Sequence, residues 1–398
     1  MPKKRWSMYV HPWDIIDEGI DKTLQFLSNS GISTINIASS YHTGRYILPH
    51  NPKKKIYIAE EGTVYFKPNY DYFKNSRIKP RVSRNYESHD ILKELLERAQ
   101  SYNMNVSSWT VFLHNSVFTN EYPDLAIVDP FGNRDGNFLC PNRNETRNYM
   151  ASLSANIADY GIRTIQMESC GYPNGLNHGN HHEIFGVKVD PTVSYLFTLC
   201  YCKQCKRKAL DMGLNLDEKL PSIRNLISVS LNSDDSPSYD IPLEEKIMMD
   251  LKKFDLEKLI EFKQLTVNEV IGSIRERLKE TVTNCNIEVI VNPETCLNEG
   301  MSFENPPFGI SGIDMITYYP EINNITNKIE WAIKLLKKKI NLFPCIRITY
   351  PMIKSEEQLR KTVDAIDKLN IQGVNFYNYG WAPEQTLKNL SSALTKFL

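Results

Sequence analysis

Short runs rich in apolar and β-branched residues alternate along the chain with longer segments in which apolar residues recur three and four positions apart. The first pattern is typical of buried strands and the second of amphipathic helices. Strand–helix alternation predicts a parallel sheet, and eight such units predict a closed (β/α)8 barrel. Eight strand-like runs occur, each ending in polar or aromatic residues: 7–14, 33–42, 105–114, 163–169, 287–294, 314–321, 342–350 and 373–380.

Helical segments separate most of these strands. They span 20–31, 91–103, 146–161, 327–340 and 356–370, and a longer helix is predicted over 243–280. Four of the helices close with a residue typical of a C-cap: Gly31, Asn103, Gly161 and Asn370. Because the chain shows no internal repeat and no second core, we predict a single barrel domain over 1–398.

Two long insertions follow strands of the predicted barrel, at about 43–90 and 170–245. The first contains 54–66, where Glu61 and Gly62 separate two strand-like halves. We interpret this segment as a hairpin inserted after the second strand, so it does not enter the strand count. The second insertion holds a histidine-rich segment, a cysteine cluster and a Ser/Asn/Asp-rich stretch at 228–240.

The composition narrows the class of protein. Hydrophobic residues make up 41% of the 398 residues, enough for a large core, and 47 basic residues balance 47 acidic ones. Such balance argues against nucleic-acid and anionic-membrane partners, which need a basic excess. No apolar run approaches the roughly 18 residues of a membrane span. We expect a cytoplasmic protein that has reduced cysteines and no signal peptide. Whether it forms a homo-oligomer stays open.

Aromatic and polar residues gather at the predicted strand ends, where this fold places its active site. Flat rings beside hydrogen-bonding groups suit a sugar, whose faces are apolar and whose edge carries hydroxyls. We therefore predict a carbohydrate substrate. The candidate substrate-binding residues at the strand ends are His11, Trp13, Tyr41, His42, Trp109, His114, Tyr318, Arg347, Tyr350, Tyr377, Asn378 and Trp381.

Two glutamates are the candidate catalytic residues. Glu168 ends the fourth strand and Glu294 ends the fifth, so neighbouring strands bring both to the mouth of the barrel. Glycoside hydrolysis needs two carboxyl groups flanking the bond, about 5–5.5 Å apart for retention and about 6.5–9.5 Å apart for inversion. Structural roles stay open: Glu168 as a buried ion-pair partner, and Glu294 as a helix cap or a partner of Arg347.

The histidine-rich segment after the fourth strand has three interpretations. Imidazoles and a carboxylate suit Zn, Mn or Fe, although the order HxxHHE is not the HExxH motif of zinc proteases. The same groups could bind substrate hydroxyls or orient Glu168, and a plain loop is the third interpretation. The residues concerned are His178, His181, His182 and Glu183.

The cysteine cluster suggests a structural zinc ion as a cofactor. Cys200, Cys202 and Cys205 lie within six residues, and the last two form a CxxC. A zinc site here needs a distant fourth ligand such as Cys170 or Cys140. Reduced cysteines that only pack in the core are the equal alternative.

Four motifs also resemble a known group of proteins. They are FGNRD at 131–135, LCPN at 139–142, MESCGYPNGLNHGNHHE at 167–183 and LCYCKQC at 199–205. Their order is similar to that in mostly uncharacterised bacterial TIM-barrel proteins related in outline to retaining (β/α)8 glycosidases. In that clan the acid/base residue ends the fourth strand, which corresponds to Glu168. The clan's nucleophile ends the seventh strand, where this chain reads RITYP and has no carboxylate.

The resemblance implies a glycoside hydrolase that cleaves a glycosidic bond by paired-carboxylate catalysis. The assignment of Glu294 as the second carboxylate rests on the adjacent strand ends alone. Two alternatives remain: a metal-dependent hydrolase or isomerase that uses the histidine-rich segment, and a carbohydrate-binding barrel without catalysis.

Overall fold

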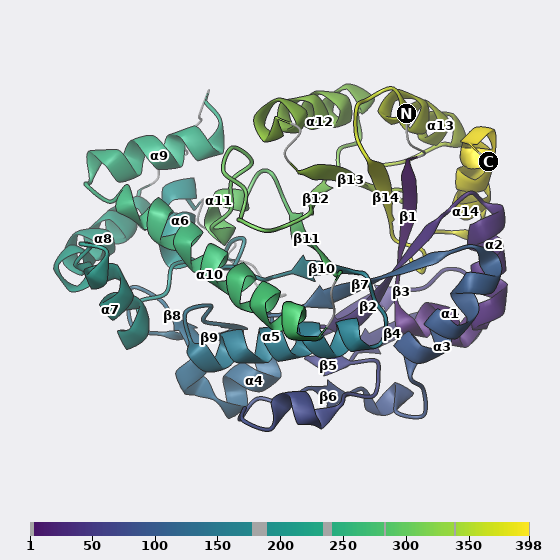
Figure 1. The fold of residues 1–398 in the computed structure, drawn as a ribbon. Coiled ribbons are helices and arrows are strands. Elements are labelled where there is room, and N and C mark those ends of the chain that lie inside the picture. Colours follow the sequence, from purple (N-terminus) through teal and green to yellow (C-terminus); the bar gives the residue numbers. More distant parts are fainter. Residues whose placement is uncertain (1–3, 177–188, 234–240, 282–283, 338–339, 398) are drawn as a thin grey trace.

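A computed structural model describes residues 4–176, 189–233, 241–281, 284–337 and 340–397. Eight parallel strands form a closed barrel, since β1 pairs with β2 on one side and with β14 on the other (Figure 1). All eight predicted strands are confirmed. They are β1 (Arg5–Val10), β2 (Thr34–Tyr41), β7 (Asn105–Val111), β10 (Thr164–Glu168), β11 (Asn286–Val291), β12 (Gly312–Ile316), β13 (Asn341–Arg347) and β14 (Gly373–Tyr377).

Amphipathic helices cover the outside of the barrel. Their buried faces carry the apolar residues that the spacing predicted, and the expected caps at Gly31, Asn103 and Gly161 adopt positive φ angles. The covering helices are α1 (Pro12–Glu18), α2 (Ile20–Asn29), α3 (Ile91–Ala99), α5 (Asn144–Asp159), α10 (Lys258–Thr281), α12 (Ile322–Leu336), α13 (Glu356–Asp367) and α14 (Glu384–Leu394).

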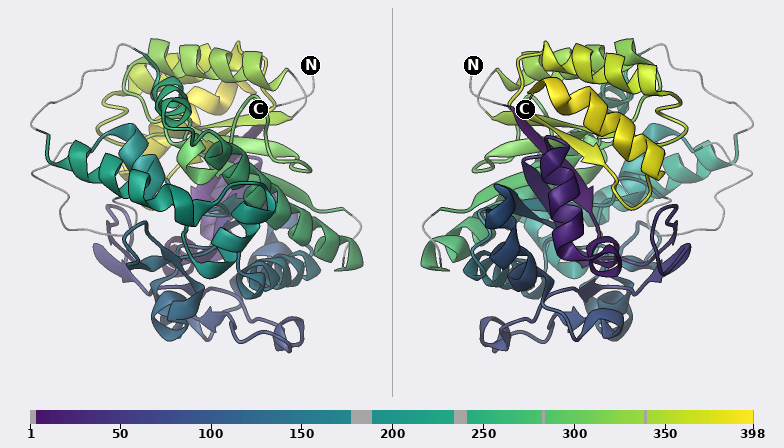
Figure 2. Two further views of the ribbon diagram at one scale, coloured as in Figure 1. Left: turned by 90° about the vertical axis from the view of Figure 1, so that its left-hand side faces the viewer. Right: turned by 90° about the vertical axis from the view of Figure 1, so that its right-hand side faces the viewer.

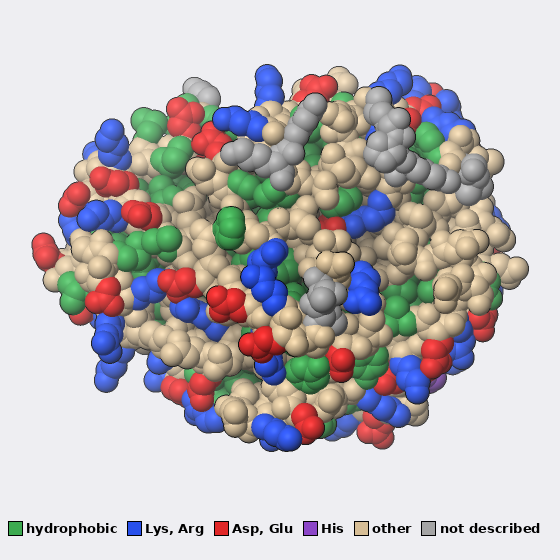
Figure 3. Space-filling view, viewed as in Figure 1, with side chains coloured by type: hydrophobic (Ala, Val, Ile, Leu, Met, Phe, Trp, Pro, Cys, Tyr) green, Lys and Arg blue, Asp and Glu red, His purple; other side chains and the backbone are tan. Residues whose placement is uncertain are grey.

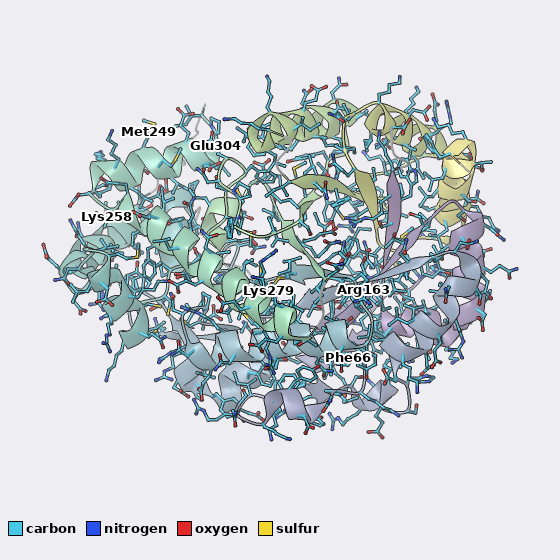
Figure 4. All side chains as sticks on the ribbon, viewed as in Figure 1. Phe66, Arg163, Met249, Lys258, Lys279 and Glu304 are labelled. Carbon is cyan, nitrogen blue, oxygen red and sulfur yellow. The ribbon has the colours of Figure 1, made fainter. Side chains whose placement is uncertain are left out.

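The predicted helix over 243–280 is broken in the structure. It divides into α9 (Leu243–Lys253) and α10, and Asp255 between them has a φ of 54°. Leu251 before the break and Leu256 after it are both buried. Figure 4 labels Lys258 and Lys279 near the two ends of α10, and α10 packs against α5.

The hairpin prediction for 54–66 is corrected. The segment is an insertion outside the barrel, but its two halves do not pair with each other. Instead β4 (Ile56–Ala59) pairs with β3 (Gly44–Ile47), while β5 (Thr63–Val64) pairs antiparallel with β2. Gly62 has a φ of 58° and lies so close to the Asn115 side chain that a Cβ would clash, so it directs the chain back onto the barrel.

The second insertion forms a helical layer on one side of the barrel. Figure 2 shows this layer on the side opposite β1 and α14. The layer consists of three helices that precede α9, namely α6 (Pro191–Phe197), α7 (Lys203–Asp211) and α8 (Leu216–Leu231).

A short antiparallel pair of strands outside the barrel, β8 (Ala126–Val128) and β9 (Arg134–Leu139), follows α4 (Ser116–Glu121).

The amino-terminal end of the barrel interior is polar. The Arg5 guanidinium donates two hydrogen bonds to Glu288, at 2.6 and 2.8 Å, and lies 3.6 Å from Asp314. The Asn375 amide donates to Asp314 at 2.6 Å, and the Asn36 amide donates to Asn375 at 3.1 Å. Buried charges of this kind require such partners, so this end of the barrel is closed by a connected network.

The surface reflects the balanced composition. Figure 3 shows acidic and basic side chains interspersed over the face in view. Among the described helices, none combines the length and the apolar character that a bilayer crossing demands.

Candidate active site

Glu168 is the last residue of β10 and reaches the mouth of the barrel. Gln166, two residues earlier, points into the barrel interior, where its amide lies 3.4 Å from the Glu288 carboxylate. Because side chains alternate along a strand, Glu168 shares the inward face of Gln166. The Trp109 indole N–H, from the neighbouring β7, donates a 2.6 Å hydrogen bond to the Glu168 carboxylate.

A cavity of about 280 Å³ lies beside this carboxylate. Five of the predicted substrate-binding residues line it with Glu168, namely Trp109, Tyr318, Arg347, Tyr377 and Trp381. The other lining residues, which sequence reasoning missed, are Tyr9, Ile290, Ile316 and Cys345. The lining residues come from strands all around the barrel, so the cavity is the central opening of its mouth.

Aromatic rings make up most of the cavity wall. The Tyr318 and Tyr377 rings stack with centroids 5.7 Å apart, and Trp381 meets Tyr377 edge-on at 5.0 Å. Tyr9 packs edge-on against Trp109 at 5.0 Å. Such pairs are rigid and leave flat faces for an apolar ligand surface.

Polar atoms in this wall are available to a ligand. Within the described chain, the Tyr9 hydroxyl and the Trp381 indole N–H are buried and have no hydrogen-bond partner. Burial raises the pKa of Tyr318 and Tyr377 well above the ordinary value, and the Glu168 charge adds to this. These phenols therefore stay protonated at neutral pH and can donate to hydroxyl or carboxyl oxygens.

Other predicted residues lie behind the wall. His11 stacks on the fully buried Trp13 at 4.3 Å, and its Nδ1 lies 3.3 Å from the Asn378 amide nitrogen. Burial lowers the pKa of His11, so its ring is neutral at neutral pH. The ring centroids of His11 and Tyr41 lie 5.2 and 4.8 Å from that of Trp109, so both residues support the side chain that holds Glu168.

His42 and His114 form a second stacked pair next to this support. Their ring centroids are 4.5 Å apart, and His42 also stacks on Tyr41 at 4.4 Å. Neither histidine lines the cavity beside Glu168. They therefore lie one layer away from the position of a ligand in that cavity.

Glu294 lies apart from the cavity lining. Its carboxylate accepts a 2.6 Å hydrogen bond from the Tyr319 hydroxyl and pairs with Lys328 of α12 at 2.7 Å. Partial burial would raise the pKa of Glu294, but Lys328 and Tyr319 outweigh burial and lower it. The side chain is 44% exposed. The sequence-based alternative of an ion pair with Arg347 is not what the structure shows.

A third glutamate, Glu299 in α11 (Cys296–Glu299), was missed by sequence reasoning. It is buried, and burial is the main cause that raises the pKa of Glu299 to about 8, with a contribution from the Glu168 charge. Its Oε1 lies 3.4 Å from the Thr295 hydroxyl. No strand pattern marks this residue, because it lies in a short helix after β11.

The remaining predicted residues divide into two groups. Tyr350 lies on the rim of a larger groove that adjoins the cavity, and 77% of its surface is exposed. His178, His181, His182 and Glu183 lie outside the described residues, so their three interpretations remain predictions.

Four buried cysteines form a separate cluster. Their sulfur atoms all lie within 4.8 Å of one another, with Cys140 3.5 Å from Cys205 and 4.0 Å from Cys202. A disulfide would need about 2.05 Å, whereas zinc at about 2.3 Å from each sulfur sets tetrahedral ligands roughly 3.8 Å apart. Cys140 therefore completes the predicted set of Cys200, Cys202 and Cys205 as a group that can bind a metal.

Hydrogen bonds to the sulfurs support a thiolate site. The Asn142 amide donates to Cys205 at 3.3 Å, and the Val128 backbone N–H donates to Cys200 at 3.4 Å. Such outer contacts are typical of metal-bound thiolates. Cys170, the other predicted fourth ligand, does not belong to this cluster.

Comparison with solved structures identifies the architecture. A β-galactosidase from Bacillus circulans sp. alkalophilus aligns with a TM-score of 0.57 and 12% identity over 99% of this chain and 55% of its own. The fold that the two share is the (β/α)8 barrel. An α-L-fucosidase isoenzyme 2 from Paenibacillus thiaminolyticus aligns with a TM-score of 0.52 and 11% identity over 100% of this chain and 49% of its own.

A β-galactosidase from the psychrophilic Marinomonas ef1 gives a TM-score of 0.57 at 8% identity, over 98% of this chain and 58% of its own. The chain thus spans about half the length of these structures. No family model matches the sequence, and no curated protein is similar to it in sequence. The expected likeness to glycosidase barrels is confirmed at the level of the fold.

Proposed function

We propose that the protein is a glycoside hydrolase in which Glu168 is the general acid/base. The observation that supports this most is the position of the Glu168 carboxylate in a ring-lined cavity at the mouth of the barrel. The cavity is near the lower end of ligand pockets, roughly 300–1,000 Å³, and suits about one sugar ring. Rings would cover the sugar faces while tyrosine hydroxyls bind its edge.

The candidate for the second catalytic group, Glu294, does not line the cavity. Among the described residues, Glu168 is the only carboxylate that lines the cavity. Glu294 would have to exchange Lys328 for the substrate in order to act, and its ion pair favours a structural role instead. Glu294→Gln separates the two roles, because loss of a catalytic carboxylate costs at least about 10²-fold in kcat and loss of an exposed ion pair costs little.

A panel of aryl glycosides and oligosaccharides tests the activity itself. We expect the wild-type protein to hydrolyse at least one member and Glu168→Gln to lose at least about 10²-fold in kcat. Glu261→Gln, which removes an exposed carboxylate on α10, is the matched control and should keep full activity. Unchanged turnover in Glu168→Gln would remove Glu168 from the mechanism.

One observation favours a rival function. A cavity with a single described carboxylate also fits a barrel that binds carbohydrate without cleaving it. Saturable binding of oligosaccharides by the wild-type protein, with no turnover across the same panel, would select this rival.

We also propose that the four-cysteine cluster binds a structural zinc ion. Four sulfur ligands fill a tetrahedral site and leave no open position for a substrate, which is typical of structural zinc. The cluster connects the loop after β9 with α7 in the second insertion. Zinc would therefore fix this insertion to the barrel and take no part in cleavage.

A further inference from the structure

We propose that the substrate is an acidic saccharide, whose carboxylate, sulfate or phosphate group binds in a basic groove beside the Glu168 cavity. This inference rests on the proposed function in one respect: it takes the cavity as the place where the sugar is cleaved. It adds the charge of the substrate, which neither the fold nor the similar solved structures determine.

The groove is continuous with the cavity. Arg347 and Trp381 line both, and the Arg347 guanidinium lies 5.9 Å from the Trp381 ring. The groove has a volume of about 900 Å³, several times that of the cavity. It runs between strand β3 and the first turns of α13 and α14. A saccharide with one residue beside Glu168 would therefore extend along the groove.

The charges that line the groove have one sign. Among the described residues, its charged lining consists of Arg45, Arg347 and Lys354, with neither Asp nor Glu. None of the three forms an ion pair within the described residues. By contrast, Arg77 and Arg81, which lie in the same insertion as Arg45, each pair with a glutamate. In a chain of zero formal net charge, three unpaired cations in one groove are a local excess. An anion is the ligand that such a groove favours.

Arg347 is placed to bind the anionic group next to the reacting sugar. Its Nε donates to the Thr349 hydroxyl at 3.2 Å, which fixes the side chain and leaves both terminal nitrogens without a described partner. A guanidinium held in this way can bind a carboxylate or a sulfate through two parallel hydrogen bonds. Arg347 makes no ion pair with Glu168, although both line the cavity.

The rest of the lining favours a saccharide over other anions. The Tyr46 and Trp381 rings stack at 5.3 Å and offer a flat platform, and Tyr350 stands exposed at the rim. Hydroxyl and amide side chains also line the groove: Thr349, Ser355, Gln385, Thr386 and Asn389. Rings with neutral polar groups suit sugar faces and hydroxyls, and the three cations add preference for an acidic one.

Binding of the 398-residue Glu168→Gln protein to an array of neutral, uronate-containing, sulfated and phosphorylated glycans tests the inference. We expect signals on acidic glycans, and the uronate, sulfate and phosphate spots show which group is recognised. Arg347→Gln should weaken binding of the best acidic glycan by roughly ten-fold or more, and Arg45→Gln, at an exposed position, should weaken it less. Lys79→Gln, an exposed lysine outside the groove, is the control and should bind as the parent does.

Equal binding of neutral and acidic glycans, or unchanged affinity in a folded Arg347→Gln protein, would overturn the inference. The outcome is separable from that of the proposed function. Selective acidic binding that depends on Arg347, in a protein whose Glu168→Gln variant retains full turnover, would support the groove and reject the role of Glu168. Turnover of neutral glycosides alone would reject the acidic substrate and leave the proposed hydrolase activity standing.

Discussion

The indole N–H of Trp109 and the carboxylate of Glu168 are joined by a 2.6 Å hydrogen bond between adjacent strands of the barrel. The bond holds one oxygen of the Glu168 carboxylate, and Glu168 lines the cavity. Trp109 is itself fixed by contacts with Tyr9, His11 and Tyr41, so the orientation of Glu168 depends on packing that extends well behind it.

Trp109→Phe should therefore lower activity without unfolding the protein. The ring volume is largely kept, but the hydrogen bond to the carboxylate is lost, and such bonds to charged groups contribute about 1.5–3 kcal/mol. We expect kcat to fall by roughly ten-fold or more with a smaller change in KM. Trp331→Phe on α12 is the control. Equal kcat in wild type and Trp109→Phe would show that this bond does not orient the reacting group.

Zinc content and stability should change together at the cysteine cluster. Cys205→Ser removes one of four ligands, and we expect about one zinc ion per wild-type chain and a strong loss in the variant. Structural zinc sites contribute directly to folding free energy, so the melting temperature should fall as well. Cys285→Ser, outside the cluster, should change neither quantity. Elemental analysis that finds no zinc in protein purified without chelator would favour packing thiols.

Arg5 should be essential to the stability of the barrel. Arg5→Met leaves the Glu288 and Asp314 carboxyl groups buried without their cation, which typically costs about 3–5 kcal/mol. Arg360→Met breaks an exposed pair with Asp364 and should cost less than about 1 kcal/mol. Unfolding by urea measures both. Similar losses in the two variants would mean that the buried network is not what stabilises this end.

His50 should make stability depend on pH. Burial disfavours the charged ring, but Glu18 at 3.0 Å and the Ala382 carbonyl at 2.7 Å outweigh burial and raise the pKa of His50. A raised pKa in the folded state gives stability that is fully present below the unfolded pKa of about 6.5 and is lost as pH rises through the folded value. The loss of unfolding free energy in His50→Phe, relative to wild type, should therefore be about 1 kcal/mol larger at pH 5.5 than at pH 9. A difference independent of pH would contradict this ion pair.

The sequence predicted the barrel well because its signal is local. Each strand is a short apolar run that ends in polar residues, and those ends mark the mouth that holds Glu168, Trp109 and Trp381. The pairing of β3 with β4, and of β5 with β2, could not be read in the same way. The turn that carries the chain from β4 into β5 holds Gly62 against Asn115, a residue far away in the sequence.

Long-range contacts also explain what was missed at the candidate site. Tyr46 reaches the groove from an insertion, and Cys140 meets the other cysteines from more than fifty residues away in the chain. Tyr9 lies inside β1, directly before its last residue Val10, so residues chosen at strand ends did not include it. For Glu294 the adjacent strand end was identified, but its pairing with Lys328 depends on the placement of α12.

The most direct test of the central claim is how the loss of kcat/KM in Glu168→Gln depends on the leaving group of the substrate. A general acid matters most when the departing oxygen is a poor leaving group and least when it is an activated phenol. Across a series of aryl glycosides, we predict that kcat/KM falls by at least about 10²-fold for the poorest leaving group and progressively less as the phenol becomes more acidic. A loss of the same size for every leaving group, or no loss at all, would contradict the role of Glu168 as the proton donor.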